Sequence, residues 1–268
     1  MTPDENDRRD DVGELLQRPA SSLDASDAAV QSDERRGPDL PNIPLLDASR
    51  ADAAEPRPTW RGWIHAVTFP VTVVAGIVLI SLAHGTPAKW ASAVFVITSM
   101  LLFGNSALYH RFDWKPRTKI ILKRIDHANI FLLIAGTYTP LAILALPPEK
   151  GILLLVLVWA GALLGIGFRV FWITAPRWLY VPIYLALGWA AVMYIGDLLS
   201  ASVAMMVLVL VGGILYTVGA VIYGLKRPNP FPGRFGFHEI FHTLTVLAFL
   251  CHWTAVLIIA MHPVYNAG

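Results

Sequence analysis

Cysteine and charged side chains are what this sequence has least of. The chain has a single cysteine, Cys251, among 268 residues, which excludes both a disulfide framework and a zinc site built from thiolates. Charged residues make up 15% of the sequence and hydrophobic residues 55%, whereas a soluble domain carries roughly 25% charged residues. The composition therefore predicts a membrane protein.

Acidic residues become scarce after position 58. Of the 19 Asp and Glu residues, 14 precede Thr59, in a segment with 7 basic residues and no sustained apolar period. We expect residues 1–58 to form a disordered cytoplasmic tail and residues 59–268 to form a transmembrane domain. The acidic residues of that domain are few enough to consider singly: Asp113, Asp126, Glu149, Asp197 and Glu239.

Seven apolar runs follow Trp60, each close to the roughly 20 residues needed to cross the hydrocarbon core. Runs of this length must be helices, because a backbone polar group cannot stay unpaired in lipid. The sequence therefore predicts an all-α integral membrane protein, a bundle of seven transmembrane helices. The expected spans are 63–84, 88–110, 125–146, 151–172, 178–199, 203–224 and 238–262. Kinks are expected at Pro70, Pro140 and Pro182.

Basic residues are unequally divided between the two sets of connections. Those after the second, fourth and sixth spans carry 11 Lys and Arg residues, and the opposite connections carry only Lys89 and Lys150. By the positive-inside rule, this bias places the N-terminus in the cytoplasm and the C-terminus on the extracytoplasmic side. We expect a multi-pass protein of the plasma (inner) membrane.

Two histidines, His238 and His242, open the last apolar run four residues apart. This spacing puts both imidazoles on one face of a helix, where they can hold one divalent cation. His110 and Asp126 flank the first basic loop, so both are expected at the same depth as the histidine pair. Ser106 lies one turn before His110 and shares its face. Polar residues far apart in the sequence can therefore meet at this depth.

This arrangement predicts a Zn²⁺ site with three neutral imidazole ligands, His110, His238 and His242, and a fourth position open to water. The ion would lower the pKa of a bound water from roughly 15.7 towards about 7, which gives a hydroxide nucleophile. Asp126 is then a candidate catalytic base or a direct ligand. Ser106 is a candidate catalytic residue that hydrogen-bonds the water or the oxyanion.

Each assignment has a simpler alternative. The three histidines can be ordinary interfacial residues. Asp126 can pair with Arg124 or cap its own helix. Ser106 can bond the carbonyl group four residues before it.

The sequence leaves the roles of two further residues, Glu239 and His65, open. Glu239 completes an H-E-x-x-H string, in which the Glu would serve as a general base, but its direction is about 100° from that of His238. His65 lies at the same expected depth, at the start of the first span, and is a reserve ligand.

Three segments resemble the signature segments of the hemolysin III family, and they occur in the expected order on the expected spans. That family belongs to the progestin and adipoQ receptor group, within a superfamily of membrane hydrolases that includes alkaline ceramidases. The stretch 59–65 departs from the pattern, because it lacks the Glu and Asn that many relatives carry there. The segments are Ser106–Phe112, Arg124–Pro140 and Gly236–His242.

The resemblance implies seven transmembrane helices with a cytoplasmic N-terminus. It also implies zinc held by His110, His238 and His242, with Asp126 and Ser106 beside the bound water.

Residues and resemblance together predict a zinc-dependent integral membrane hydrolase, in which zinc-bound hydroxide attacks a lipid amide or ester at the cytoplasmic leaflet. A ceramide-like lipid is a candidate substrate on the resemblance alone, and no nucleic-acid partner is expected. The alternative is a seven-helix receptor or a pore-forming, hemolysin-type protein with a structural zinc. An intramembrane metalloprotease would need an acidic third ligand on a later segment, and no acidic residue follows Glu239.

Overall fold

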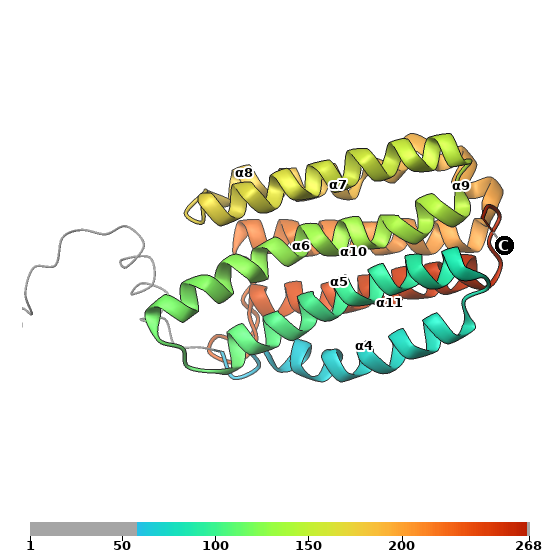
Figure 1. Ribbon diagram of the computed structural model, residues 1–268. Helices are drawn as coiled ribbons and strands as arrows, with labels where there is room; N and C mark the ends of the chain where they lie inside the picture. The colour runs from blue at the N-terminus through green and yellow to red at the C-terminus, as the bar shows by residue number, and fades with distance from the viewer. Residues whose placement is uncertain (1–57, 267–268) are drawn as a thin grey trace, which may run out of the picture. The chain divides into compact units, whose positions relative to one another are not determined.

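The computed structural model describes residues 58–266, and the expectations for the tail before residue 58 lie outside the described residues. The described part is helical and contains no β-strand (Figure 1). Its elements are α4 (Trp63–Leu82), α5 (Thr86–Arg111), α6 (Pro116–Ala145), α7 (Pro148–Phe171), α8 (Arg177–Gly188), the 3₁₀ turn η1 (Ala190–Tyr194), α9 (Ile195–Ala201), α10 (Val203–Leu225) and α11 (Phe237–Met261).

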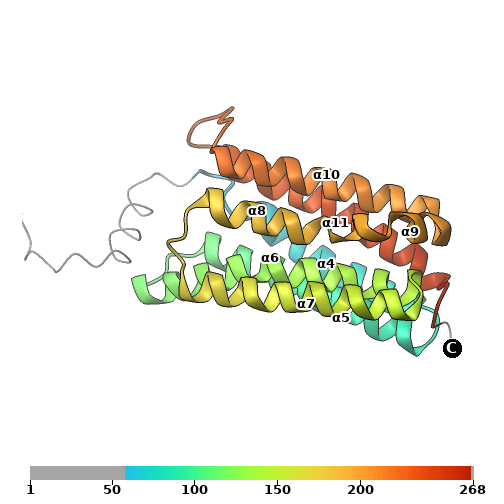
Figure 2. The ribbon, with the colours of Figure 1, turned by 90° about the horizontal axis from the view of Figure 1, so that it is seen from above.

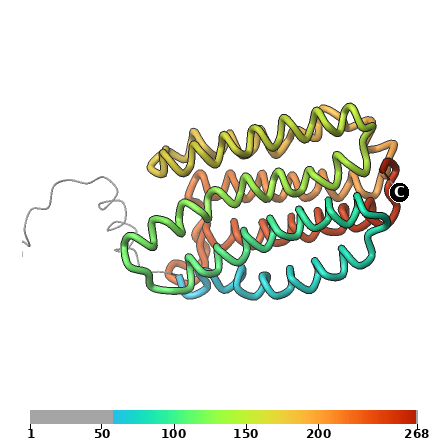
Figure 3. Tube along the Cα trace, in the orientation of Figure 1, coloured from blue at the N-terminus to red at the C-terminus, as the bar shows by residue number. Residues whose placement is uncertain are grey.

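Seven of the described helical spans are long and apolar enough to cross a membrane, with α8, η1 and α9 together forming the fifth. The prediction of a seven-helix transmembrane bundle is confirmed. The chain runs up and down, so that alternate connections gather at the same end (Figure 3). We call one of these ends the basic end, and it comprises 58–62, 112–115, 172–176 and 226–236.

The spans α6 and α11 lie in the interior of the bundle. In the apolar stretch of α6, 78% of the residues are buried, and α6 packs against α5, α7 and α11. α11 also packs against α4, α5 and α10, and the view from above shows it beside α10 (Figure 2). The outer faces carry exposed large apolar side chains, for example Leu164 at 76% and Val67 at 62% exposure, which is the surface expected of helices that face lipid.

The predicted spans agree with the observed helices within three residues at every boundary except one. The third span was expected to begin at residue 125, but α6 begins at Pro116. The added turns contain Lys119 and Lys123, which ended the apolar run without ending the helix, because Lys is a good helix former. Pro116 in the first turn provides the start signal.

The fifth span is interrupted near its middle. Pro182 lies inside α8, as Pro70 and Pro140 lie inside α4 and α6, yet the break comes later, at Trp189. The Tyr138 hydroxyl of α6 donates to the Gly188 carbonyl at 2.6 Å and accepts from the Ala191 N–H at 2.8 Å. Interrupted backbone is tolerated at membrane depth where such partners exist.

Replacing Tyr138 with Phe should destabilise the bundle, because the Gly188 carbonyl and the Ala191 N–H both lose their partner. We expect a loss of about 2 kcal/mol in the free energy of unfolding, measured by unfolding the protein in detergent. Tyr194→Phe is the matched control, since it removes a tyrosine hydroxyl from η1 and leaves the partner of Gly188 and Ala191 in place. Equal stability of the two variants would contradict the role given to Tyr138.

Candidate metal centre

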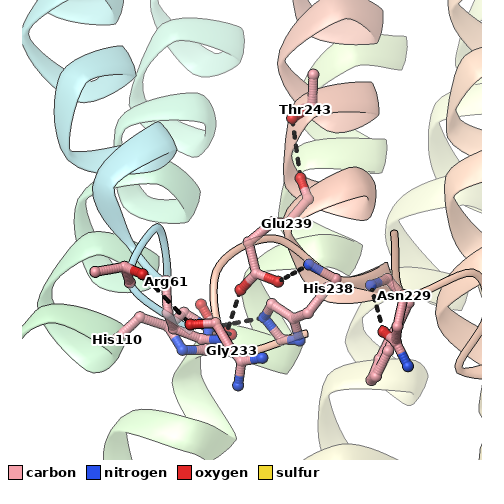
Figure 4. Close-up of polar contacts among 11 residues, drawn as sticks. Arg61, His110, Asn229, Gly233, His238, Glu239 and Thr243 are labelled. Carbon is pink, nitrogen blue, oxygen red and sulfur yellow. Dashed lines mark hydrogen bonds and ion pairs between the residues drawn. The ribbon is translucent and has the colours of Figure 1, made fainter. Parts of the chain in front are cut away.

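The first turn of α11 is capped by two side chains. Glu239 accepts a hydrogen bond from the Gly236 N–H at 2.9 Å, and Asn229 accepts one from the Phe237 N–H at 3.0 Å (Figure 4). Both bonds use backbone donors that have no partner within the helix. The helix therefore begins at Phe237, and His238 lies in its first turn.

Three histidines from two helices meet at the basic end. The Nε2 atoms of His110 and His238 are 3.3 Å apart, and one ring nitrogen from each of His110, His238 and His242 lies within 4.8 Å of the other two. His242 is 3% exposed and the His110 side chain 9% exposed. The structure thus brings together the three residues that the sequence analysis selected as ligands.

The spacing of these nitrogens suits a tetrahedral metal ion. Zinc binds imidazole nitrogens at about 2.0–2.1 Å, which places two ligands of a tetrahedron about 3.3 Å apart. The separation between His110 and His238 matches this value, and a modest approach of His242 would complete the set. These three histidines can therefore form a metal site.

Asp126 and Ser106 lie beside the cluster. The Asp126 Oδ2 atom is 3.9 Å from the His110 Nε2 atom, and the carboxyl group also interacts with the side chains of Ser106 and Asn105. The Nε atom of Arg124, the alternative partner of Asp126, is buried without a hydrogen bond to any described residue. The carboxylate and the hydroxyl face the histidines at the depth predicted from the sequence.

His65 does not join the ligand atoms. Its ring stacks on His242 with a centroid distance of 3.8 Å and an interplanar angle of 9°, and Phe103 packs against it edge-on at 5.1 Å. Two parallel stacked imidazoles direct their nitrogens side by side, not towards a shared ion. His65, which is 2% exposed, therefore supports the ring of His242.

Glu239 is engaged in an ion pair away from the histidine nitrogens. Its Oε1 atom accepts a 2.8 Å bond from the Arg61 Nε, and its Oε2 atom accepts from Gly236 (Figure 4). The Glu239 side chain is 1% exposed and that of Arg61 25% exposed. Both oxygens are thus used to hold the start of α11, and the general-base interpretation loses its geometric support.

The segment before α4 packs closely on the cluster. The backbone N–H groups of Thr59 and Trp60 donate to the carbonyl groups of Gly233 and Arg234. Gly62 has a φ of +80°, and a Cβ atom there would lie 2.8 Å from the His110 Cβ. A side chain at this position would both strain the backbone and displace His110.

The cluster opens into a cavity of about 540 Å³ inside the bundle. Along α6 its wall runs from Lys119 to Leu141, about 33 Å of helix axis. Along α11 it runs from His238 to His252, about 21 Å. The wall beyond the histidines consists mainly of apolar side chains, among them residues of α6, α8 and α10: Ile130, Ile134, Leu141, Val181, Leu185, Met206, Val209 and Leu210.

The inner part of the cavity also contains polar side chains, among them His252 and Tyr216. His252 is 9% exposed, and its ring lies 5.4 Å from that of Tyr216. The His252 Nε2 atom lies 3.2 Å from the Val209 carbonyl oxygen. Gly212 allows this packing, because a Cβ atom there would lie 2.4 Å from the imidazole. His252 is too far along α11 to share an ion with His238.

Comparisons with known proteins identify similar chains. A family model described as "Haemolysin-III related" matches residues 54–253. The Hemolysin-3 homolog of Bacillus subtilis is 36% identical over 186 residues, which cover 68% of this chain and 84% of that protein. Hemolysin-3 of Bacillus cereus is 34% identical over 182 residues, 66% of this chain and 80% of that protein. The ADIPOR-like receptor IZH2 of Saccharomyces cerevisiae is 46% identical over 54 residues, 18% of this chain and 17% of that protein.

Removing the Arg61–Glu239 ion pair should loosen the start of α11. We expect Glu239→Ala to lower the free energy of unfolding by about 3 kcal/mol, because Arg61 loses its partner and the Gly236 N–H its acceptor. Glu239→Gln should cost less, since the amide oxygen still accepts from Gly236. Unfolding in detergent measures both losses.

A double-mutant cycle with Arg61→Gln tests whether the two side chains act as a pair. The double variant with Glu239→Gln should lose at least about 1 kcal/mol less stability than the two single variants together. Glu239→Gln should also keep the metal content of the wild type. Loss of metal from this variant with stability unchanged would instead favour a direct role at the ion.

Proposed function

The chain belongs to the haemolysin-III related family of membrane proteins, and from this premise we propose that it is a zinc-dependent integral membrane hydrolase acting on a lipid amide or ester. The observation that carries the proposal is the position of the three histidines at the polar end of a long apolar cavity. A metal that only stabilised the bundle would need no such cavity beside it. An amphipathic substrate would need both the polar histidine cluster and the apolar cavity.

The residues around the cluster suit hydrolysis of a carbonyl compound. A zinc ion on the three imidazoles would supply a Lewis acid and a water of lowered pKa. Asp126 lies close enough to His110 to take a proton from a water at the cluster and pass it to the leaving group. The hydroxyl group of Ser106, next to Asp126, is suited to donate a hydrogen bond to negative charge on the substrate oxygen.

The dimensions of the cavity agree with a lipid. An extended acyl chain advances about 1.25 Å per carbon atom, so the roughly 21 Å between His238 and His252 would hold about 16 carbons. Apolar walls bury such a chain favourably, at roughly 0.8 kcal/mol for each CH₂ group. A ceramide-like lipid is one member of the proposed class.

We further propose that the basic end faces the cytoplasm, in the plasma (inner) membrane, and that residues 1–58 form a separate cytoplasmic tail. Support comes from the excess of Lys and Arg in the connections at this end. The substrate would then enter from the cytoplasmic leaflet.

A second candidate function has support from the names of the relatives, which include hemolysins and a receptor. In a receptor or pore-forming protein, zinc would serve to hold α5 to α11. Removal of the metal would then loosen the bundle, and no lipid would be turned over.

The first test compares the zinc content of the purified wild type with that of His238→Ala. We expect about one zinc per chain in the wild type and a loss of at least tenfold in affinity in the variant, because one of three protein ligands is gone. Elemental analysis gives the stoichiometry. Release of fatty acid from a panel of labelled lipid amides and esters then gives the activity.

Asp126→Asn separates metal binding from chemistry. This variant should keep its zinc and lose at least a hundredfold in turnover, because the amide cannot accept the proton. Stoichiometric zinc in the wild type, combined with no turnover of any lipid in the panel, would favour the receptor or pore-forming function.

The orientation can be tested through cysteine accessibility. Cys251→Ala removes the single native thiol, after which Thr86→Cys and Lys115→Cys place one thiol at each end of the bundle. A membrane-impermeant maleimide should label Thr86→Cys in intact cells and Lys115→Cys only after lysis. The reverse pattern would place the basic end outside.

A further inference from the structure

Two polar side chains in the inner wall of the cavity have atoms without a hydrogen-bond partner. His252 and Tyr216 both line the cavity, and their rings are in contact, with a centroid distance of 5.4 Å. The Nδ1 atom of His252 and the hydroxyl group of Tyr216 are buried without a hydrogen bond to any described residue. Such atoms destabilise a fold unless a bound molecule supplies the missing bonds.

Other polar side chains of the same wall have their partners inside the protein. Thr137 and Thr245 each donate to the carbonyl group four residues before them. The Trp189 indole donates to the Thr217 hydroxyl, which donates in turn to its own helix. Tyr138 bonds two backbone groups of the fifth span. Unpaired polar atoms are therefore not a general property of this wall.

The bond between His252 and Val209 determines which atoms are left over. The His252 Nε2 atom lies 3.2 Å from the Val209 carbonyl oxygen, and because a carbonyl group can only accept, Nε2 carries the proton. In the neutral imidazole, Nδ1 is then an acceptor. The hydroxyl group of Tyr216 can donate. The pair thus offers one acceptor and one donor to a ligand.

A hydroxyl group meets both requirements with one oxygen atom, since it can donate to the His252 Nδ1 and accept from Tyr216. A carbonyl or ether oxygen could only accept, which would leave Nδ1 unpaired. A carboxylate would also bring a charge into the apolar part of the bundle. A CH₂ group would satisfy neither atom.

The pair lies at a defined distance from the histidine cluster. His252 follows His242 by 10 residues and His238 by 14 on the same helix, which gives about 15 Å and about 21 Å along the axis. An extended hydrocarbon chain covers these distances with about 12 and about 17 carbon atoms. The position of the pair thus specifies where on a chain the hydroxyl group would be.

We propose that His252 and Tyr216 bind a hydroxyl group on the apolar chain of the ligand, about 12–17 carbon atoms from the group at the histidine cluster. The inference rests on the proposed hydrolase function and specifies its substrate class, a lipid amide or ester with a hydroxylated acyl chain. The bond to be cleaved lies at the cluster, the chain follows the apolar wall, and its hydroxyl group is held by the pair.

The test compares two isomeric lipid ethers that cannot be hydrolysed, 1-O-(14-hydroxyhexadecyl)glycerol and 1-O-(6-hydroxyhexadecyl)glycerol. Only the first carries its hydroxyl group within the proposed range. Binding to the purified full chain is measured in a non-ionic detergent. We expect the 14-hydroxy ether to bind at least about tenfold more tightly, because its isomer leaves the His252 Nδ1 and the Tyr216 hydroxyl unpaired. Equal affinities, as expected if a water molecule fills the site, would overturn the proposal.

Tyr216→Phe removes the donor and should reduce the preference to less than about threefold. The variant should bind unsubstituted 1-O-hexadecylglycerol at least as tightly as the wild type does, since that chain no longer leaves a hydroxyl group unpaired. General damage to the cavity would instead weaken binding of all three ethers, and a preference that persists at tenfold would overturn the role of Tyr216 and with it the proposal.

Thr245→Val is the matched control. It also removes a hydroxyl group from the cavity wall, but one that already donates to the Phe241 carbonyl, so the tenfold preference should remain. An equal loss of preference in Thr245→Val and Tyr216→Phe would overturn the proposal. His252→Leu removes the acceptor and should also reduce the preference to less than about threefold, so that it carries the test if Tyr216→Phe does not fold.

The glycerol esters of 14-hydroxyhexadecanoic and 6-hydroxyhexadecanoic acid separate this inference from the proposed function. Cleavage of both esters with equal kcat/KM, together with equal binding of the two ethers, would overturn the hydroxyl site and leave the hydrolase intact. Selective binding of the 14-hydroxy ether without cleavage of either ester would overturn the hydrolase and leave the hydroxyl site standing.

Discussion

The ion pair between Arg61 and Glu239 is the contact on which the arrangement at the basic end depends. A carboxylate that is 1% exposed is costly in an apolar bundle unless both oxygens have partners. Glu239 obtains one partner from its own helix end and the other from Arg61. Since His65 lies one turn after Arg61 and stacks on His242, the start of α4 touches α11 at two levels. The two histidines on α11 are thereby held by a neighbouring helix that contributes no residue to the cluster.

The same requirement explains the broken fifth span. The backbone between α8 and α9 leaves the α-helical pattern inside the membrane, where water is not available as a partner. The Tyr138 hydroxyl donates to the Gly188 carbonyl and accepts from the Ala191 N–H. Thr217 accepts from the Trp189 indole at 3.0 Å. Residues 188, 189 and 191 also line the cavity. The interruption of the helix therefore widens the space beside α6, while the backbone groups of Gly188 and Ala191 keep their hydrogen-bond partners.

A feature of this structure could be predicted from the sequence when the residues that determine it lie close together in the chain. The length of an apolar run is such a feature, so the seven spans and nearly all their ends were predicted. The start of α6 is the exception, because its first turns are helical but basic. The depth of a residue in the membrane can also be predicted, since each loop marks where the two spans beside it end. This places His110, Asp126, His238 and His242 at one level. Arg61 was missed because its partner Glu239 lies 178 residues away and nothing near either residue signals the other. The stacking of His65 could not be predicted, because it depends on how α4 is rotated about its own axis. The nearly uniform apolar surface of α4 does not specify that rotation.

The position of the cluster at one end of the bundle, not at its centre, is the position that the proposed lipid hydrolase would require. Water and a charged headgroup are stable only outside the hydrocarbon core, whereas an acyl chain is stable only within it. A site for the bond between them must therefore lie at the boundary, with a polar opening on one side and an apolar cavity on the other. Basic residues gather at that same end of the bundle, as the positive-inside rule expects of an end that faces the cytoplasm. A short extension of α6 beyond the apolar span suffices to place two of them, Lys119 and Lys123, in the cavity wall.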